Sequence, residues 1–207
     1  VPILDNKTPL QHASIPVMDA LPAKREVGNV INCPDGLPAG SDTAILSIFG
    51  ADPNVCYTGR SPLEAAATGI QLQPGDVSYR CNMIALEDSD LPFEEKKILS
   101  HSGGSIEGDQ SIQLVTDLFN DPEFQAAAQK AGMVVHPAAS FRHIAVQSGA
   151  NIVGIQLIPP HDHLGEVIGP LLPSGNDNAE VLKDLMKLAH KVLDHHPINE
   201  KRRAEGK

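Results

Sequence analysis

The chain has 207 residues, of which 41% are hydrophobic and 20% are charged, and it contains 17 glycines and 17 prolines. This balance is typical of a turn-rich globular protein and excludes a disordered or fibrous chain. A formal net charge of −10 repels the phosphate backbone of a nucleic acid, and the one basic cluster, residues 201–203, is short. Both observations disfavour nucleic-acid binding. Three cysteines without CxxC spacing favour a reducing cytoplasm. No run approaches the ~20 apolar residues of a membrane span, and no signal peptide is recognisable, so we expect neither a membrane anchor nor secretion.

The first part of the chain predicts short elements that lead to a serine at the start of a helix. A helix is expected from Pro16, and β-branched residues favour a strand over residues 27–33. A stretch rich in glycine and proline then leads to Ser41. Apolar residues at helical spacing after Ser41 predict a helix that ends near Gly50.

The rest of the chain predicts helices and strands in irregular alternation. The patterns favour, in chain order, a helix ending at Gly69, a strand over residues 77–86, a helix over 109–119, and strands over 141–146 and 152–157. Residues 159–178 are rich in proline, glycine and histidine and are expected to form a mobile or site-forming loop. An apolar stripe at 3.6-residue spacing predicts that the longest helix covers residues 179–195.

Ser41 is the candidate phosphate-accepting group. The first turn of a helix offers unpaired N–H groups and a partial positive charge, both of which stabilise a phosphate. A serine hydroxyl attacks phosphorus only when it is activated, for example by divalent cations. Serine is also a favoured helix cap, and spacing alone makes capping the more frequent role.

Three arginines, Arg60, Arg80 and Arg142, are candidates for binding a phosphorylated acid. A planar guanidinium pairs with carboxylate or phosphate through two hydrogen bonds, and an acidic protein must concentrate positive charge locally to bind such a ligand. A structural salt bridge is an equal alternative for each of them.

Two short segments combine imidazoles and carboxylates, over residues 161–163 and 194–196, and neither has a spacing diagnostic of a metal site. A substrate-facing or solvated loop is favoured over a metal pair for His161 and His163. His195 and His196 are expected in the last turn of a helix, where imidazole meets the negative end of the dipole.

Several motifs in the same order resemble the archaeal-type 2,3-bisphosphoglycerate-independent phosphoglycerate mutases of the alkaline phosphatase superfamily. They are KTPL (residues 7–10), GLPAGSDTA (36–44), YTGRSPLEA (57–65), PGDV (74–77), RCN (80–82), FRH (141–143), PHD (160–162) and HPIN (196–199). Because they run through nearly the whole chain, the resemblance is a specific one.

The resemblance implies an α/β fold, in which part of an alkaline-phosphatase-like core is joined to an α+β substrate-binding insert domain. Residues 1–58 would belong to the core, 59–178 to the insert, and 179–207 to a long helix and the start of the return to the core. It also implies that Ser41 takes the phosphate of 3-phosphoglycerate as a phosphoserine and that the 2-hydroxyl of glycerate recovers it. The net reaction is an isomerisation of glycolysis and gluconeogenesis, expected in the cytoplasm.

Family motifs contain six further residues that are expected to contact substrate or transfer protons: Arg60, Arg80, Arg142, His143, His161 and Asp162. Two divalent metal ions, manganese or magnesium with zinc as an alternative, are expected in the complete enzyme, with Ser41 as the one ligand kept here. The other metal motifs of the family would precede Val1 and follow Lys207. We therefore expect a fragment that is inactive alone, and the sequence predicts no oligomeric state.

Two alternatives stay open. A phosphohydrolase or another phosphomutase of the same superfamily would share the serine chemistry, although the insert motifs favour the mutase. A non-catalytic phospho-ligand-binding module would use Ser41 only as a helix cap.

Overall fold

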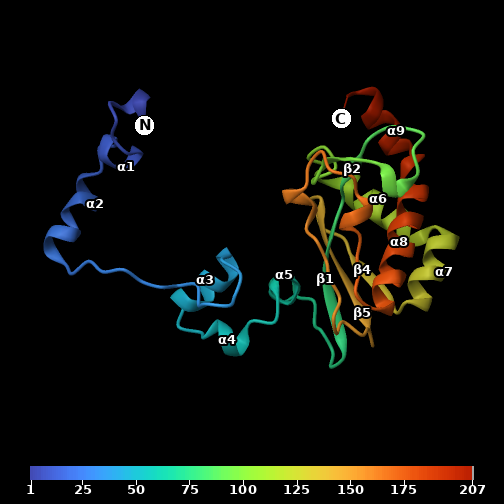
Figure 1. Ribbon diagram of the computed structural model, residues 1–207, viewed down its shortest axis with the longest axis horizontal. Coiled ribbons are helices and arrows are strands. Elements are labelled where there is room, and N and C mark those ends of the chain that lie inside the picture. The colour runs from blue at the N-terminus through green and yellow to red at the C-terminus, as the bar shows by residue number, and fades with distance from the viewer. Residues whose placement is uncertain (207) are drawn as a thin grey trace. The chain divides into compact units, whose positions relative to one another are not determined.

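The computed structural model describes residues 1–206, and the chain divides into two compact units, Val1–Tyr57 and Thr58–Lys207 (Figure 1). The first unit contains short helices joined by irregular segments. They are η1 (Pro2–Leu4), α1 (Pro9–His12), α2 (Pro16–Ala20), η2 (Pro22–Lys24), α3 (Ser41–Ile48) and α4 (Pro53–Cys56). Proline stands in the first turn of α1, α2 and α4, where its missing N–H removes no helical hydrogen bond.

The strand expected over residues 27–33 is wrong, because this segment has no regular structure. Val27, Val30 and Ile31 are strongly exposed. A strand pairs its N–H and C=O groups with a neighbour, and the described residues of the first unit contain no other strand to supply one. The residues of this segment favour the β conformation, but without a neighbouring strand to pair with, the segment stays irregular.

The second unit is built on antiparallel strands. They are β1 (Asp76–Asn82), β2 (Ala85–Leu86), β3 (Ile98–Ser100), β4 (Met133–His136) and β5 (Arg142–Ser148). One sheet has the order β1-β5-β4, and a smaller one pairs β2 with β3. The single strand expected over residues 77–86 is therefore two strands in different sheets, since pairing of β1 with β5 ends at Asn82.

The strand expected over residues 152–157 is also wrong. The segment makes one isolated bridge, between Gln156 and Ser174. Gly154 has a φ of 76°, which turns the chain out of the extended conformation in the middle of the apolar run.

Helices cover both faces of the larger sheet (Figure 1). The helices of this unit are α5 (Arg60–Ala67), α6 (Asp109–Asn120), α7 (Pro122–Lys130), α8 (Asp177–Asp194) and α9 (Pro197–Ala204), with 3-10 turns η3 (Phe93–Glu95), η4 (Pro160–Asp162) and η5 (Gly169–Leu171). Of these, α5 lies on one face of the sheet and α6, α7 and α8 on the other. The expected helix over 109–119 and the expected longest helix are confirmed as α6 and α8. None of the described helices is long and apolar enough to cross a membrane.

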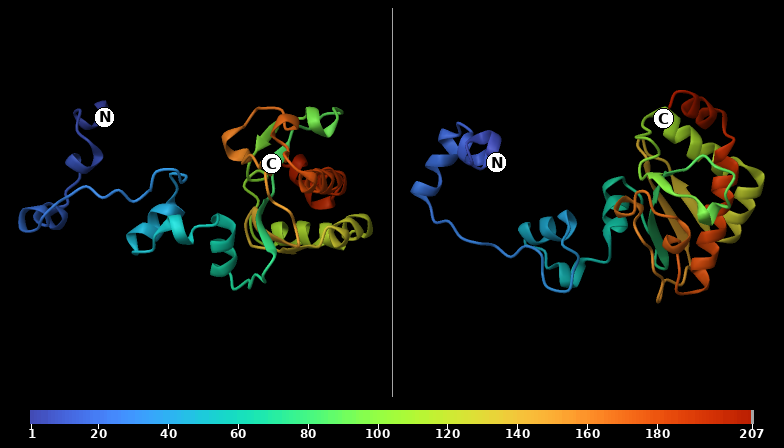
Figure 2. Two further views of the ribbon diagram at one scale, coloured as in Figure 1. Left: turned by 60° about the horizontal axis from the view of Figure 1, so that its bottom comes forward. Right: turned by 45° about the horizontal axis from the view of Figure 1, so that its top comes forward.

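Two apolar clusters fix these layers. On one face, Ala65 of α5 packs against Ile144 and Val146 of β5. On the other, α6, α7 and α8 share a cluster centred on Leu118, Phe124, Ala128 and Leu185. The yellow and red helices, α7 and α8, lie on the same side of the sheet in both views of Figure 2. The mixed helix-and-strand class expected from the sequence is confirmed.

Candidate functional site

Ser41 is the first residue of α3, and its side chain is exposed. The N-cap is Gly40, and Ser41 makes no side-chain hydrogen bond to any described residue. This arrangement disfavours the capping role that spacing alone suggests. The hydroxyl lies at the N-terminal end of the helix, where a phosphate would be stabilised.

Thr43 holds the turn that presents Ser41. Its side chain is fully buried, at 0% exposure, and its Oγ1 lies 2.9 Å from the carbonyl oxygen of Pro38 and 3.0 Å from that of Gly40. A hydroxyl donates one proton, so it serves one of these carbonyls at a time, and it accepts from the N–H of Gly40 at 3.4 Å. The loop before Ser41 is thereby tied to the helix that follows it.

Asp42 explains why a glycine precedes Ser41. A Cβ built on Gly40 would lie 2.3 Å from Oδ1 of Asp42, so a larger residue would displace this carboxylate. Oδ2 of Asp42 accepts a hydrogen bond of 2.6 Å from the hydroxyl of Tyr57. The carboxylate therefore folds back over the turn and is held there by the segment after α4.

In the second unit, two of the three candidate arginines share one carboxylate. Nε of Arg60 donates to Oε1 of Glu64 at 3.0 Å, and Nε of Arg80 lies 3.0 Å from Oε2. The Arg80 contact lacks the alignment of a hydrogen bond, so its buried Nε has no hydrogen-bond partner among the described residues. It is therefore an electrostatic contact between two charged groups.

Strand register brings the third arginine to the same face. Arg142 on β5 lies opposite Asn82 on β1, and Arg80 lies opposite Ile144. Side chains directly opposite or two residues apart along a strand share a face. Because Ile144 packs on α5, both arginines lie on the α5 face. Between them, the buried Oδ1 of Asn82 has no hydrogen-bond partner in the described structure.

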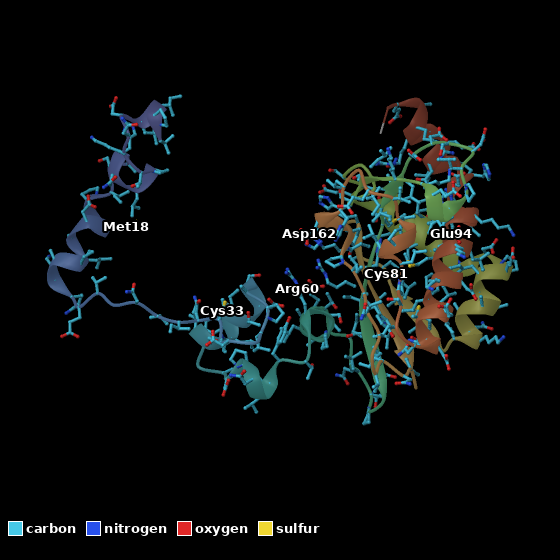
Figure 3. All side chains as sticks on the ribbon, in the orientation of Figure 1. Met18, Cys33, Arg60, Cys81, Glu94 and Asp162 are labelled. Carbon is cyan, nitrogen blue, oxygen red and sulfur yellow. The ribbon has the colours of Figure 1, made fainter. Side chains whose placement is uncertain are left out.

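A chain of ring contacts links this face to η4. The guanidinium carbon of Arg142 lies 4.4 Å from the ring centroid of Phe141. The imidazole of His101 lies edge-on to Phe141 at 6.0 Å and to His161 at 6.4 Å, measured between ring centroids. Nε2 of His161 lies 3.6 Å from a carboxylate oxygen of Asp162. In Figure 3, Arg60 and Asp162 both lie at the edge of the second unit away from α7 and α8.

His101 was not found by sequence reasoning. The available signal was its loop, Ser-His-Ser-Gly-Gly-Ser over residues 100–105, in which small residues flank one imidazole. Such a composition is typical of a tight turn, in which His101 is the one titratable side chain.

His143 differs from the other candidates because it is only 1% exposed. Its Nδ1 accepts from the N–H of Ala138 at 3.0 Å, so the neutral ring carries its proton on Nε2, 3.2 Å from Oγ of Ser111. Ser111 in turn donates to the carbonyl of Ser140 at 2.7 Å. Burial lowers the pKa of His143 to about 4. In this structure the ring fixes β5 to neighbouring backbone and presents neither nitrogen to a ligand.

Cys81 lies directly opposite His143 in the β1–β5 pairing. Burial raises the pKa of its thiol to about 11. The thiolate, which is the reactive form, is therefore scarce at neutral pH. The face that carries Cys81 and His143 is a structural one.

The remaining histidine segments also have structural partners. Nδ1 of His163 lies 3.2 Å from Oε1 of Glu166, and His195 is the exposed C-cap of α8. His196, expected in the last turn of that helix, instead caps the start of α9, and its Nε2 lies 3.1 Å from Asp117. The proline after His196 begins a new helix at its first position.

The described residues do not fit a resident divalent metal ion. No group of three or more His, Cys, Asp or Glu side chains in the described part of the chain could hold one. Magnesium and manganese require several oxygen ligands, and Ser41 supplies a single hydroxyl.

A family model described as 2,3-bisphosphoglycerate-independent phosphoglycerate mutase matches residues 23–199. The chain belongs to this family. A family member named 2,3-bisphosphoglycerate-independent phosphoglycerate mutase from Methanosarcina acetivorans is 38% identical over 204 residues, which cover 99% of this chain and 48% of the relative. One from Methanothermobacter thermautotrophicus, named as mutase 2, is 37% identical over 204 residues, covering 99% and 47%.

A solved structure of a protein from Pyrococcus horikoshii matches all of this chain and 44% of its own, with 29% identity and a TM-score of 0.64. The chain spans about half the length of the curated family members it matches. The family match includes Ser41 and every arginine and histidine of the candidate site.

Proposed function

We propose that this chain is part of a cofactor-independent phosphoglycerate mutase, in which Ser41 carries phosphate transiently and the α5 face of the second unit binds phosphoglycerate. The observation that carries the proposal is the position of Ser41: exposed, first in its helix, and without a hydrogen-bonded partner among the described residues. The three arginines on one face support binding of a ligand with both carboxylate and phosphate groups.

In the proposed reaction, Oγ of Ser41 forms a bond to phosphorus while the bond from phosphorus to the 3-oxygen of glycerate breaks. The serine loses its proton and the departing oxygen gains one. The 2-hydroxyl of glycerate then attacks the phosphoserine with the same exchange of protons, so the net change is an isomerisation. We assign His161 and Asp162 to proton transfer or substrate contact, because they lie next to Phe141 and Arg142 through the His101 ring.

The proposal includes two divalent metal ions in the complete protein, manganese or magnesium with zinc as an alternative. Metal ions supply charge neutralisation at the phosphoryl oxygens. Ligands other than Ser41 would come from outside these 207 residues, so the chain alone would be inactive. A place in glycolysis and gluconeogenesis, and a cytoplasmic location, belong to the same proposal.

The test uses the complete protein, quenched with acid during turnover of 3-phosphoglycerate and analysed by peptide mass spectrometry. We expect phosphate on Ser41, and loss of both phosphoserine and turnover in Ser41→Ala. Ser47→Ala is the matched control, because that hydroxyl only bonds to the carbonyl of Thr43 within the same helix. Turnover by Ser41→Ala would exclude Ser41 as the nucleophile. Exclusive release of inorganic phosphate by the wild type would identify a phosphohydrolase.

A further inference from the structure

The loop that carries His101 has an unusual backbone. Gly103, Gly104 and Ser105 have φ values of 54°, 66° and 55°, so three successive residues are left-handed. For a residue with a Cβ, such as Ser105, this conformation is unfavourable by about 1 kcal/mol. Hydroxyl groups hold the loop from inside: Oγ of Ser100 accepts from the N–H of Gly104 at 2.9 Å, and Oγ of Ser102 accepts from that of Ser105 at 3.2 Å.

Arg202 of α9 holds the same loop from outside. Its Nη2 donates to the carbonyl oxygens of Gly103 at 2.8 Å and Gly104 at 3.2 Å, and its Nη1 donates to Oε1 of Gln110 at 3.4 Å. The side chain is 8% exposed and forms no ion pair within residues 1–206. A buried cation is unfavourable unless it is hydrogen-bonded, and here its partners are neutral oxygens, two from the turn and one from Gln110 of α6.

The opposite end of this loop enters the candidate site. His101 stands two residues before Gly103, and its ring contacts Phe141 and His161. Phe141 in turn lies under Arg142. A guanidinium on α9 and an imidazole at the site are therefore joined by a short, internally hydrogen-bonded turn.

We propose that Arg202 is a positioning residue for the candidate site: by binding the Gly103 and Gly104 carbonyls it fixes the turn that aims His101 at His161 and Phe141. The position of α9 then affects the orientation of the His101 ring at the candidate site. His196, which caps α9 and pairs with Asp117 on α6, anchors the other end of this helix. That the site binds a phospho-acid rests on the proposed function, whereas the coupling of Arg202 to His101 does not.

The experiment follows the histidine ring signals of the 207-residue chain by NMR, with His101 and His161 assigned from His101→Gln and His161→Gln. In Arg202→Gln and in Arg202→Lys, which keeps the charge but lacks the fork, we expect both signals to shift. Binding of 3-phosphoglycerate to the same samples is expected to weaken by about tenfold, the change that accompanies loss of one good polar contact.

Arg203→Gln is the matched control, because it removes the same charge from the same helix but pairs with Asp194, away from the loop. It should leave both ring signals and the affinity unchanged. Arg202 variants that lower the melting temperature while His101 and His161 keep their signals would overturn the proposal and leave a purely structural arginine. If Arg202→Gln does not fold, Arg202→Lys gives the same comparison. Shifted rings in a chain that does not bind 3-phosphoglycerate would support the coupling and count against the proposed function alone.

Discussion

The hydroxyl of Tyr57 lies 2.6 Å from Oδ2 of Asp42, the residue that follows Ser41 in the first turn of α3. A hydrogen bond to a carboxylate is stronger than one between neutral groups. A negative charge at this position also interacts favourably with the N-terminal end of the helix. The contact therefore ties the start of α3 to the chain beyond α4, and with Thr43 it fixes how the Ser41 hydroxyl is presented.

Replacing Tyr57 by phenylalanine should loosen this turn without removing the ring. We expect amide hydrogen exchange over residues 44–47, whose N–H groups make the first helical hydrogen bonds of α3, to accelerate by about tenfold, since a hydrogen bond to a charged group contributes about 1.5 kcal/mol. Tyr79→Phe, which removes a hydroxyl bonded to Gln147 in the second unit, is the control and should leave this exchange unchanged. Equal protection in wild type and Tyr57→Phe would mean that the hydrogen bond does not hold the turn.

Glu64 partly neutralises the two arginines that we assign to substrate. Glu64→Gln keeps the shape of the side chain and removes its charge, so the chain should bind 3-phosphoglycerate several-fold more tightly at low ionic strength. Titration calorimetry at low and high salt measures this, and the gain should shrink as salt screens the charges. Glu123→Gln, which removes an exposed carboxylate paired with Lys191, should have no effect. Weaker binding by Glu64→Gln would instead show that the carboxylate organises the arginines.

The buried neutral ring of His143 makes stability depend on pH. Its pKa is about 4 in the folded chain against an ordinary 6.5. Between pH 4 and pH 6.5 the imidazole is therefore protonated in the unfolded chain but neutral in the folded chain. The stabilisation is complete above pH 6.5 and is lost as the pH falls toward 4. The loss is about 3 kcal/mol, since each pH unit in this window corresponds to about 1.4 kcal/mol.

Urea unfolding between pH 7.5 and 4.5 measures this dependence. His143→Gln should unfold more easily at neutral pH but should show a shallower loss on acidification, because the titrating group is gone. His195→Gln, at an exposed position, should keep the wild-type slope. An unchanged slope in His143→Gln would assign the pH dependence to other groups.

Gly175 cannot carry a side chain without moving its neighbour. A Cβ there would lie 2.1 Å from the carbonyl oxygen of Gly154, and its φ of +105° is unfavourable for other residues. We expect Gly175→Ala to reduce the free energy of unfolding by at least about 3 kcal/mol. Gly165→Ala, with φ +83° and open space around its Cβ, should lose only about 1 kcal/mol. Similar losses in urea unfolding would show that backbone conformation, and not the close approach, governs Gly175.

The sequence predicted the helices whose limits are set by residues close together in the chain. The α8 helix follows from its apolar stripe, and the start of α3 from the turn before Ser41. Helix α7 was missed although Asp121 and Pro122 form a cap and first-position pair, with Asp121 accepting from two backbone N–H groups. Residues 27–33 could not be judged locally, because a strand depends on a partner from elsewhere.

For the candidate site, the sequence predicted residue types but not which residues lie close together. Residue chemistry selects Arg60, Arg80 and Arg142, but only the β1–β5 register and the shared Glu64 bring them to one face. His143 and His161 look alike in sequence, yet one is buried within a hydrogen-bonded network and the other lies in an exposed 3-10 turn. Arg202 could not be chosen from the basic run at residues 201–203, because its partners are backbone carbonyls about a hundred positions away in the chain.

The three cysteines offer a way to observe the two units separately. Cys56 is exposed in the first unit, whereas Cys81 in the second is held as an unreactive thiol with a pKa of about 11. At neutral pH, a maleimide fluorophore should therefore attach near the end of α4 and spare the sheet that carries the arginines. With Cys33→Ser, the chain becomes a singly labelled reporter of the first unit, and its fluorescence can be followed while phosphoglycerate is added.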